Sequence, residues 1–277
     1  MTAYVVGVSG GVDSITLLHM LSKISGHKIV VAHFDHGIRT DSADDASFVS
    51  TLASGYGFDF ETAREELGPS ASEEKARDRR YAFLRTVAKK HNGRIVTAHH
   101  GDDVVETIAI NFTRGTGWRG LAVLDSDVQR PLLHMSKADI LEYARLHSLE
   151  WREDSTNASD AYLRNRIRRD TKELHPDVKR ELHALRSQQI ESKRLIDQDI
   201  AALIGDGPEY SRYFFTHIPV KVAVECLRAV TDARLTRPQL ERALLAIKTA
   251  GPKSSYHAGS GLTFDFTTRN FSLSLLK

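Results

Sequence analysis

This 277-residue chain has little cysteine and no long apolar segment. It has one cysteine, Cys226, which excludes an internal disulfide framework and any Cys-x-x-Cys metal or redox motif. No apolar run is long enough to cross a bilayer, so we expect no membrane partner. The first strand-like segment begins at residue 4, which leaves no room for a signal peptide. Together these absences predict a cytoplasmic protein.

A strong charge imbalance is also absent. Lysine and arginine total 38, aspartate and glutamate total 36, and the formal net charge is +2. This balance neither favours nor excludes a polyanionic partner, because only the distribution of charge along the chain can do so. With 41% hydrophobic residues, the chain can form one large domain, or one domain with a smaller appendage.

Strand-like and helical patterns alternate through the first hundred residues. The strand-like segments are residues 4–8, 28–34 and 94–98, and the helical patterns are residues 12–24, 42–54 and 72–91. Such alternation predicts an α/β fold with a doubly wound parallel sheet covered by helices on both faces. In these folds ligands bind at the carboxyl ends of the strands, where the first glycine turn is expected.

The pattern changes after about residue 130. We expect helices at residues 136–147 and about 177–204, separated by a polar segment at 151–169. The Gly-Asp-Gly-Pro stretch at 205–208 is the best linker candidate. Beyond it we expect short helices at 220–230 and 237–250, then a β-hairpin of residues 262–266 and 271–275. The predicted domains are therefore residues 1–204 and 209–277.

The stretch SGGVDS, residues 9–14, joins the first strand to the first helix. A glycine turn at a helix N-terminus binds anions well, yet Asp13 places a carboxylate there. A divalent cation resolves this conflict, because Mg²⁺ uses one or two carboxylates together with phosphate oxygens. The loop lacks the lysine of a Walker motif and the Rossmann glycine spacing. The alternative is a tight turn capped by Ser9 and Asp13.

Two carboxylates lie three residues apart in the stretch AHHGDDVVETIAINFTRGTGWRGL, residues 98–121. Asp103 and Glu106 would share one face of a helix and could bind a cationic amine, although a solvated helix face is the alternative. Asp102 could cap the helix or orient the metal. The neighbouring histidines match no zinc motif, which disfavours a catalytic zinc. Arg114 begins a basic loop that could contact a phosphate or end the helix.

The segment from residue 162 to 194 is basic. Ten lysines and arginines face five acids, an excess of five, which favours a nucleic-acid backbone as partner over a solvated surface. The cations are Arg164, Arg166, Arg168, Arg169, Lys172, Lys179, Arg180, Arg186, Lys193 and Arg194.

The SGGVDS stretch closely resembles the PP-loop of the N-type ATP pyrophosphatases. Four further stretches narrow the resemblance to the tRNA(Ile)-lysidine synthase family: HFDHGIR (33–39), EEKARDRRYAFL (73–84), EDSTN (153–157) and RNRIR (164–168), alongside the stretch at 98–121. The resemblance covers roughly residues 4 to 170. Beyond about residue 205 it is loose, and the tail looks like a reduced version of the family's C-terminal region.

The resemblance implies an activity and its partners. L-lysine would be ligated to C2 of the wobble cytidine of CAU-anticodon tRNA(Ile), with ATP and Mg²⁺, through an adenylated base. The ATP-binding residues implied are Ser9, Gly10, Gly11, Val12, Asp13, Ser14, His33 and Arg39, with Asp13 near the metal. Asp13, Asp103 and Arg114 would be catalytic, and Asp103 with Glu106 would bind lysine. The tRNA would contact Arg164, Asn165, Arg166, Arg168 and the C-terminal domain.

Other functions stay open at this stage. A cytidine or uridine thiolase of the same superfamily would share the loop, but such enzymes typically use cysteines or an iron–sulfur cluster. An amidating or NAD-forming member would not explain EDSTN with RNRIR. A catalytically silent, ATP-gated RNA-binding protein is the alternative outside the enzymes, and the intact loop argues against it. The assembly is open between a monomer and a homodimer.

Overall fold

The computed structural model describes residues 2–24, 26–37, 42–68, 72–152, 163–205 and 207–275. No helix within these ranges is both long and apolar enough to span a bilayer. Contacts divide the chain into two compact units, Met1–Ile190 and Glu191–Lys277. This boundary precedes the sequence-based linker because the last turns of α7 (Pro176–Ile204) pack into the second unit, where Ile200 is buried. The division into domains 1–204 and 209–277 stays a prediction.

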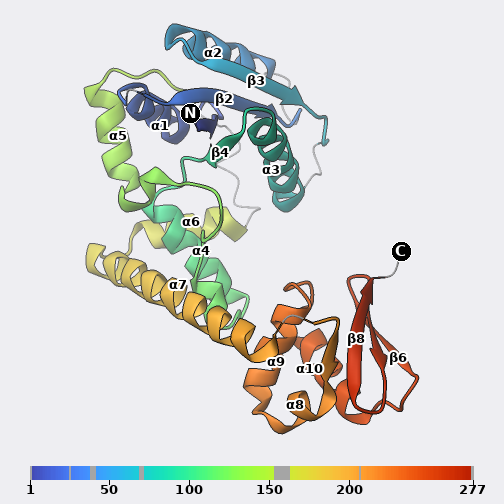
Figure 1. The fold of residues 1–277 in the computed structure, drawn as a ribbon. Coiled ribbons are helices and arrows are strands. Elements are labelled where there is room, and N and C mark those ends of the chain that lie inside the picture. The colour runs from blue at the N-terminus through green and yellow to red at the C-terminus, as the bar shows by residue number, and fades with distance from the viewer. Residues whose placement is uncertain are drawn as a thin grey trace. The chain divides into compact units, whose positions relative to one another are not determined.

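The first unit is built on a four-stranded parallel sheet with strand order β3-β2-β1-β4 (Figure 1). The strands are β1 Ala3–Gly7, β2 Lys28–Asp35, β3 Asp59–Arg64 and β4 Gly93–Val96. The expected doubly wound sheet is thus confirmed. The strand β3 was missing from the sequence-based expectation, because its DFETAR sequence is polar and half-exposed, as befits an edge strand.

Helices cover both faces of this sheet. Side chains alternate along a strand, so Val6 and Val31 pack with α1, α2 and α5 while Val5 and Val30 pack with α3 on the opposite face. The helices are α1 Val12–Ser22, α2 Ser42–Gly55, α3 Glu73–Lys90 and α5 Lys137–Leu146. The near-continuous apolar sequence of β1 follows from this burial on both faces.

The strand order places two loops beside each other. The sequence proceeds from β1 to β2 on one side and to β4 on the other, so a switch in strand order lies between β1 and β4. Ligands of doubly wound sheets bind in the crevice at such a switch. The SGGVDS loop follows β1, and α4 (Gly101–Thr113) begins shortly after β4. The fold therefore brings the two predicted site segments to one edge.

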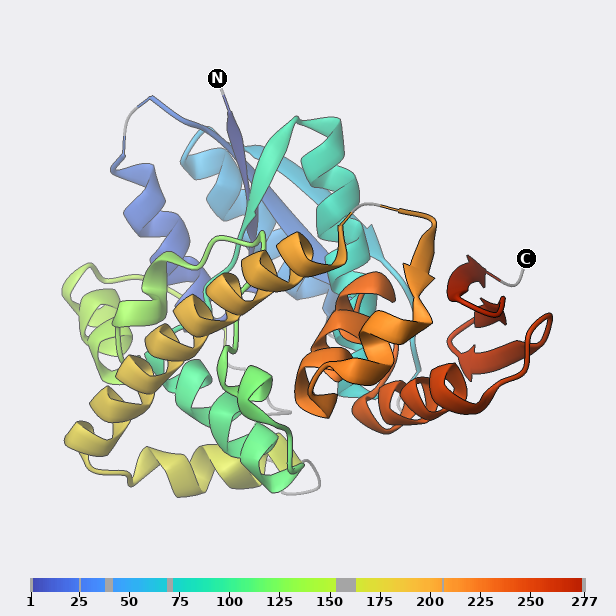
Figure 2. The same cartoon turned by 60° about the horizontal axis from the view of Figure 1, so that its bottom comes forward.

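A further helix, α6 (Leu163–Lys172), lies against α4 (Figures 1 and 2). This helix was not predicted; it begins within the segment 151–169, which the sequence analysis described only as polar. Its apolar stripe is narrow: Ile167 and Thr171 are buried one turn apart, among many charged residues. The EDSTN stretch at 153–157 lies outside the described residues.

The connection from α4 to α5 contains two short 3₁₀ turns, Trp118–Leu121 and Pro131–His134. The Gly101 N–H donates to the Met135 carbonyl over 2.8 Å, which ties the start of α4 to the residues just before α5. A Cβ at position 101 would lie 2.9 Å from that same oxygen, so the close approach requires glycine.

The second unit pairs an antiparallel sheet of order β5-β8-β7-β6 with three helices. Phe215, Phe264 and Phe271 are almost fully buried at its centre. The predicted hairpin is confirmed as β7 and β8, while β5, β6 and α8 were not expected. The elements are β5 Glu209–Ser211, α8 Arg212–His217, α9 Val220–Val230, α10 Arg237–Thr249, β6 Ser255–Gly259, β7 Leu262–Phe266 and β8 Asn270–Leu275.

Candidate functional site

The loop after β1 is shaped by one glycine and two serines. Gly10 has φ +92°, a conformation that disfavours any side chain. The Ser14 hydroxyl donates to the Gly11 carbonyl over 2.9 Å and accepts from the Ser9 N–H over 3.2 Å. Gly11 is the N-cap of α1 and has no side chain to occupy the N–H groups of the first helical turn. The loop therefore offers these N–H groups to an anion.

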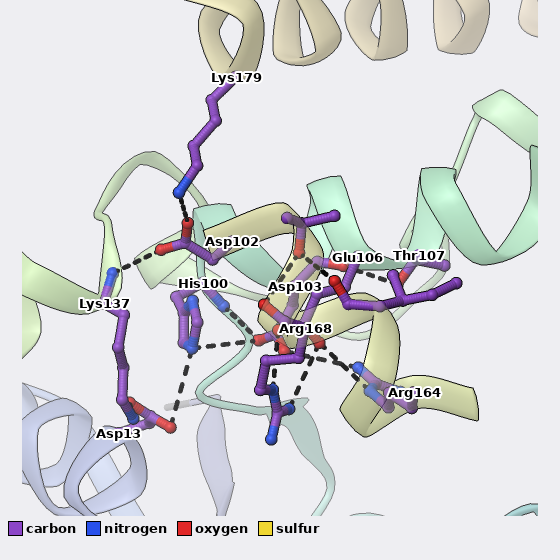
Figure 3. A network of polar contacts seen from close by, with 12 residues as sticks. Asp13, His100, Asp102, Asp103, Glu106, Thr107, Lys137, Arg164, Arg168 and Lys179 are labelled. Carbon is purple, nitrogen blue, oxygen red and sulfur yellow. Dashed lines mark hydrogen bonds and ion pairs between the residues drawn. The ribbon is translucent and has the colours of Figure 1, made fainter. Parts of the chain in front are cut away.

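Asp13 lies in the first turn of α1 with a side chain that is one-third exposed. Its Oδ1 is 2.5 Å from Lys137 Nζ, at the start of α5, and its Oδ2 is 3.8 Å from His100 Nε2 (Figure 3). His100 Nε2 also lies 3.7 Å from the nearer carboxylate oxygen of Asp103. The His100 imidazole thus lies between the carboxylates of Asp13 and Asp103.

Both predicted acids of α4 are buried. Asp103 is 8% exposed and Glu106 is 2% exposed, so neither lies on a solvated helix face. Asp103 Oδ2 accepts from the His100 N–H over 2.9 Å and so closes the first turn of α4. Buried carboxylates require partners, because desolvation penalises the charged form.

The partners come from α6. Arg168 donates from Nε to Glu106 Oε1 over 2.8 Å and from its terminal nitrogen to Oε2 over 3.3 Å. Arg164 lies 3.4 Å from Glu106 and 3.5 Å from Asp103 (Figure 3). The two acids predicted to bind lysine and two of the arginines predicted to bind tRNA therefore form one group. We call these four residues the acid–arginine cluster.

The cluster keeps its charges despite burial. Burial alone would raise the pKa of Asp103, but the His100 ring and N–H, His99 and Arg164 together hold that pKa below its ordinary value. Burial would likewise lower the pKa of Arg168, yet the hydrogen bond and charge of Glu106 raise it. Two anions and two cations therefore coexist at the start of α4, a pattern complementary to both ends of a zwitterion.

Asp102 links three helices beside the cluster. It accepts from the Lys137 N–H over 2.7 Å and from Lys179 Nζ, on α7, over 2.8 Å. Burial opposes ionisation, but these two donors and the nearby His100 ring lower the pKa of Asp102 overall. Asp102 thus fixes the start of α5 relative to α4.

The remaining predicted residues lie in different places. His33 is 4% exposed, and its Nδ1 is 2.9 Å from the Val8 carbonyl, so it supports the strand that leads into the loop. Arg114 is exposed at the C-terminal end of α4, eleven residues or roughly 16 Å from Asp103 along the helix. Arg39 lies outside the described residues. The structure does not bring Arg114 to the cluster.

The arginines of the RNRIR stretch lie on two different faces of α6. Arg164 and Arg168 point toward α4, whereas Arg166 is exposed on the other side of α6. Asn165 is half-buried. The four residues predicted to share one role therefore do not share one surface.

The donor set fits a magnesium nucleotide better than a protein-held metal. Asp13 supplies one hard carboxylate oxygen at an anion-binding turn, as expected where phosphates complete the coordination. Within the described ranges, no three histidine, cysteine, aspartate or glutamate side chains converge as a metal site. Asp13 is thus the residue that would hold Mg²⁺ beside the phosphates of ATP.

Residues 1–175 match the family model described as a PP-loop domain. The chain belongs to the PP-loop family. The matched range includes the SGGVDS loop, which resembles the PP-loop and is called the PP-loop below. The acid–arginine cluster lies at the neighbouring strand end.

Three curated relatives of this PP-loop chain share one name. Proteins called tRNA(Ile)-lysidine synthase are 41% identical over 59% of this chain in Solibacter usitatus and 34% identical over 87% of it in Thermus thermophilus. A third, from Thermotoga maritima, is 35% identical over 80% of this chain. Those matches cover 38%, 51% and 57% of the relatives. The chain thus spans about half the length of the curated relatives it matches.

Among solved structures, the U34-tRNA thiolase NcsA from Methanococcus maripaludis, with its [4Fe-4S] cluster, is similar in fold. The TM-score is 0.58 at 18% identity, and the match covers 69% of this chain and 72% of that one. The PP-loop chain differs in cysteine content: its single Cys226 is buried in the second unit, and burial raises the pKa of its thiol to about 11. Iron–sulfur clusters of this type are held by several cysteine thiolates, and this chain supplies one cysteine.

Sequence reasoning missed Lys137 and the partners of the acids. Lys137 follows Ser136, whose hydroxyl accepts from the Asp139 N–H and caps α5. A capping box at 136–139 is visible in the sequence and marks the helix start. Nothing in the sequence indicates that this lysine meets Asp13, because the two are 124 positions apart.

Proposed function

We propose that the chain ligates L-lysine to C2 of cytidine 34 in CAU-anticodon tRNA(Ile), forming lysidine, AMP and pyrophosphate from ATP. The supporting observation is the juxtaposition of a PP-loop bearing Asp13 with the buried acid–arginine cluster, joined through His100. A loop for ATP and a charge pattern for an amino acid lie at one strand edge. The names of the curated relatives support the same reaction.

The first step is adenylation of the base. The C2 carbonyl oxygen of cytidine attacks the α-phosphorus of ATP, and the bond from that phosphorus to the bridging oxygen breaks as pyrophosphate leaves. The N–H groups of the PP-loop and the N-terminus of α1 would hold the phosphate oxygens. Mg²⁺ held beside Asp13 would supply further charge neutralisation. The target base must leave its stack to reach this edge.

The second step forms the carbon–nitrogen bond. The neutral ε-amine of lysine attacks C2, the C2–O bond breaks, and AMP departs with the oxygen while the nitrogen loses a proton. Asp103 and Glu106 would bind the α-ammonium, and Arg164 and Arg168 would bind the α-carboxylate. Asp103 Oδ2 accepts from the His100 N–H, whereas the contact of Oδ1 with Arg164 is long, at 3.5 Å, which leaves Oδ1 capacity for a further partner. Holding both ends of the amino acid would aim its side chain at the base.

The tRNA would bind along exposed cations. Arg166 is exposed on α6. The C-terminal domain predicted from the sequence, residues 209–277, would contribute further contacts. Phosphate contacts of this kind position the RNA but carry no sequence information themselves. The reaction would take place in the cytoplasm, where tRNA and free lysine coexist, and the protein could act as a monomer or a homodimer.

Mass spectrometry of tRNA(Ile) nucleosides after incubation with ATP, Mg²⁺ and lysine tests the proposal directly. We expect lysidine with wild-type protein and none with Asp13→Asn, which removes the carboxylate beside the phosphates without altering core volume. Omitting lysine should leave adenylated tRNA and released pyrophosphate. A thiolated nucleoside formed with a sulfur donor in place of lysine would support the thiolase alternative and contradict lysine ligation.

A further inference from the structure

Lys137 is held in place by its backbone while its side chain stays adaptable. Its N–H donates to Asp102 Oδ2 over 2.7 Å, and the capping box formed by Ser136 and Asp139 fixes the first turn of α5. The side chain is 40% exposed and carries the ammonium on a flexible four-carbon stem. The base of this lysine is thus fixed, and its charged end can reach different acceptors.

That ammonium contacts the one PP-loop residue that repels phosphate. Lys137 Nζ lies 2.5 Å from Asp13 Oδ1, while the other Asp13 oxygen faces the His100 ring at 3.8 Å (Figure 3). Asp13 is also the carboxylate that would hold Mg²⁺. A divalent ion and an ammonium on one carboxylate would repel each other, because like charges held close together are destabilising.

The PP-loop itself contains no cation. SGGVDS offers backbone N–H groups and a helix dipole of roughly half a charge, against the several negative charges of a triphosphate. Walker loops solve this problem with their own lysine, which acts as a point charge on the phosphates. Here the lysine beside the loop comes from α5, a different element.

We propose that Lys137 neutralises Asp13 in the nucleotide-free protein and moves to the phosphate oxygens of ATP when the metal binds Asp13. This inference rests on the proposed function, since it requires that the loop binds a magnesium nucleotide. Lys137 would be the phosphate-binding lysine that the PP-loop lacks, and its exchange of partners would couple metal binding to nucleotide binding.

The alternative is an ion pair that only stabilises the fold. The proposed exchange and this alternative predict opposite changes in metal–nucleotide affinity when the charge of Lys137 is removed. If Lys137 merely competes with the metal for Asp13, removing its charge should tighten binding of both free metal and metal–nucleotide. If Lys137 moves to the phosphates, removing its charge should tighten binding of free metal but weaken binding of metal–nucleotide.

The experiment measures binding in the full chain without turnover. Mn²⁺ binding is followed by electron paramagnetic resonance, and Mg-ATP binding by calorimetry without tRNA, for wild type, Lys137→Met, Lys137→Gln and Lys137→Arg. Lys90→Met is the matched control, because it removes a lysine from a 2.7 Å carboxylate pair with Glu61 elsewhere in the first unit.

We expect Lys137→Met and Lys137→Gln to bind Mn²⁺ more tightly and Mg-ATP about tenfold to a hundredfold more weakly, the range of one charge-assisted contact. Lys137→Arg should recover most of the Mg-ATP affinity, and Lys90→Met should match wild type. Unchanged or tighter Mg-ATP binding in both neutral variants would overturn the inference while leaving the proposed function intact. Wild-type protein that binds no Mg-ATP would overturn both.

Discussion

Glu106 illustrates how burial changes the meaning of a single charged residue. On sequence alone a solvated helix face was the main alternative for this carboxylate, yet its side chain is 3% exposed and contacts two guanidinium groups. Removing one member of a buried ion pair typically costs about 3–5 kcal/mol, because the other charge stays desolvated. Any functional test of Glu106 must therefore distinguish weaker lysine binding from a less stable fold.

Neutral substitutions of nearly the same shape at Asp103 and Glu106 distinguish these two effects. Asp103→Asn keeps an oxygen that can accept from the His100 N–H, and Glu106→Gln keeps the volume of the side chain. We expect the KM for lysine to rise by about tenfold to a hundredfold in each variant, since one charge-assisted contact to the α-ammonium is lost. Adenylate formation on tRNA should change much less, because the proposed function gives these two carboxylates no part in binding ATP or cytidine. Steady-state kinetics beside pyrophosphate release measures both.

The matched control is Glu61→Gln, which neutralises an acid paired with Lys90 and His91 away from the cluster. Its lysine KM should equal that of wild type. Thermal melting of all three variants checks the fold. A normal lysine KM in both cluster variants would place the amine site elsewhere and leave these carboxylates as partners of α6.

Individual site residues could be predicted only where chemistry is visible in a short stretch. Asp13 stands out because a carboxylate in a glycine turn opposes the anion that such a turn binds, whereas Asp103 and Glu106 were singled out only with the help of the family resemblance. Their partners could not be predicted. Lys137 meets Asp13 across 124 positions and Arg168 meets Glu106 across 62, and such contacts exist only after the sheet and helices have formed.

At the scale of elements, α6 shows that one charged helix can have two roles. Its inward arginines pair with α4, and its outward face presents Arg166 to solvent. Arg166→Ala should therefore weaken tRNA binding and reduce the slope of log K against log salt by about one, with little effect on stability. Arg168→Ala should instead lower the melting temperature and raise the lysine KM, because it leaves Glu106 without its bidentate partner.

Filter binding at several salt concentrations and thermal melting distinguish these outcomes. Arg79→Ala on α3, where the arginine forms a 2.7 Å surface pair with Glu65, serves as a control for loss of a generic surface arginine. Equal salt slopes for wild type and Arg166→Ala would show that this face of α6 does not contact the RNA backbone.

The elements that the sequence predicted and the elements that it did not predict differ in their content of apolar residues. The strand β2 and helix α1 are rich in apolar residues and were predicted, whereas β3 (DFETAR) is mostly polar and lies at a sheet edge. The helix α6 has ten residues, most of them charged or polar, so its narrow apolar stripe carries little signal. Both are specified by packing against a neighbour that is already in place, not by local pattern.

At the scale of the whole molecule, four histidines respond to folding in the same direction. Burial lowers the pKa of His19, His36, His99 and His183 below the ordinary value of 6.5, and that of His99 falls to about 3. The His99 ring contacts Thr97 Oγ1 at 2.8 Å and lies near Arg77, Arg80 and Arg130, whose charges disfavour a proton on it. The folded chain thus keeps these rings neutral where the unfolded chain protonates them.

The sign of the pH dependence follows from proton counting. Below about pH 6.5 the unfolded state binds protons that the folded state does not, so the free energy of unfolding falls as the pH is lowered. For His99 this loss continues toward its folded pKa of about 3, at up to ~1.4 kcal/mol per pH unit. The lowered pKa values of Asp102 and Asp103 act in the same direction at lower pH, below about 4.

We therefore expect urea unfolding midpoints to be highest above pH 7 and to fall between pH 6.5 and 5. His99→Gln replaces the ring by an amide that does not titrate, so its stability should change less steeply with pH over this range, whatever its absolute value. His134→Gln, at an exposed position, should follow the wild-type curve. Parallel curves for wild type and His99→Gln would mean that folding does not shift the pKa of this ring, and the pH dependence would then have to come from the other buried histidines.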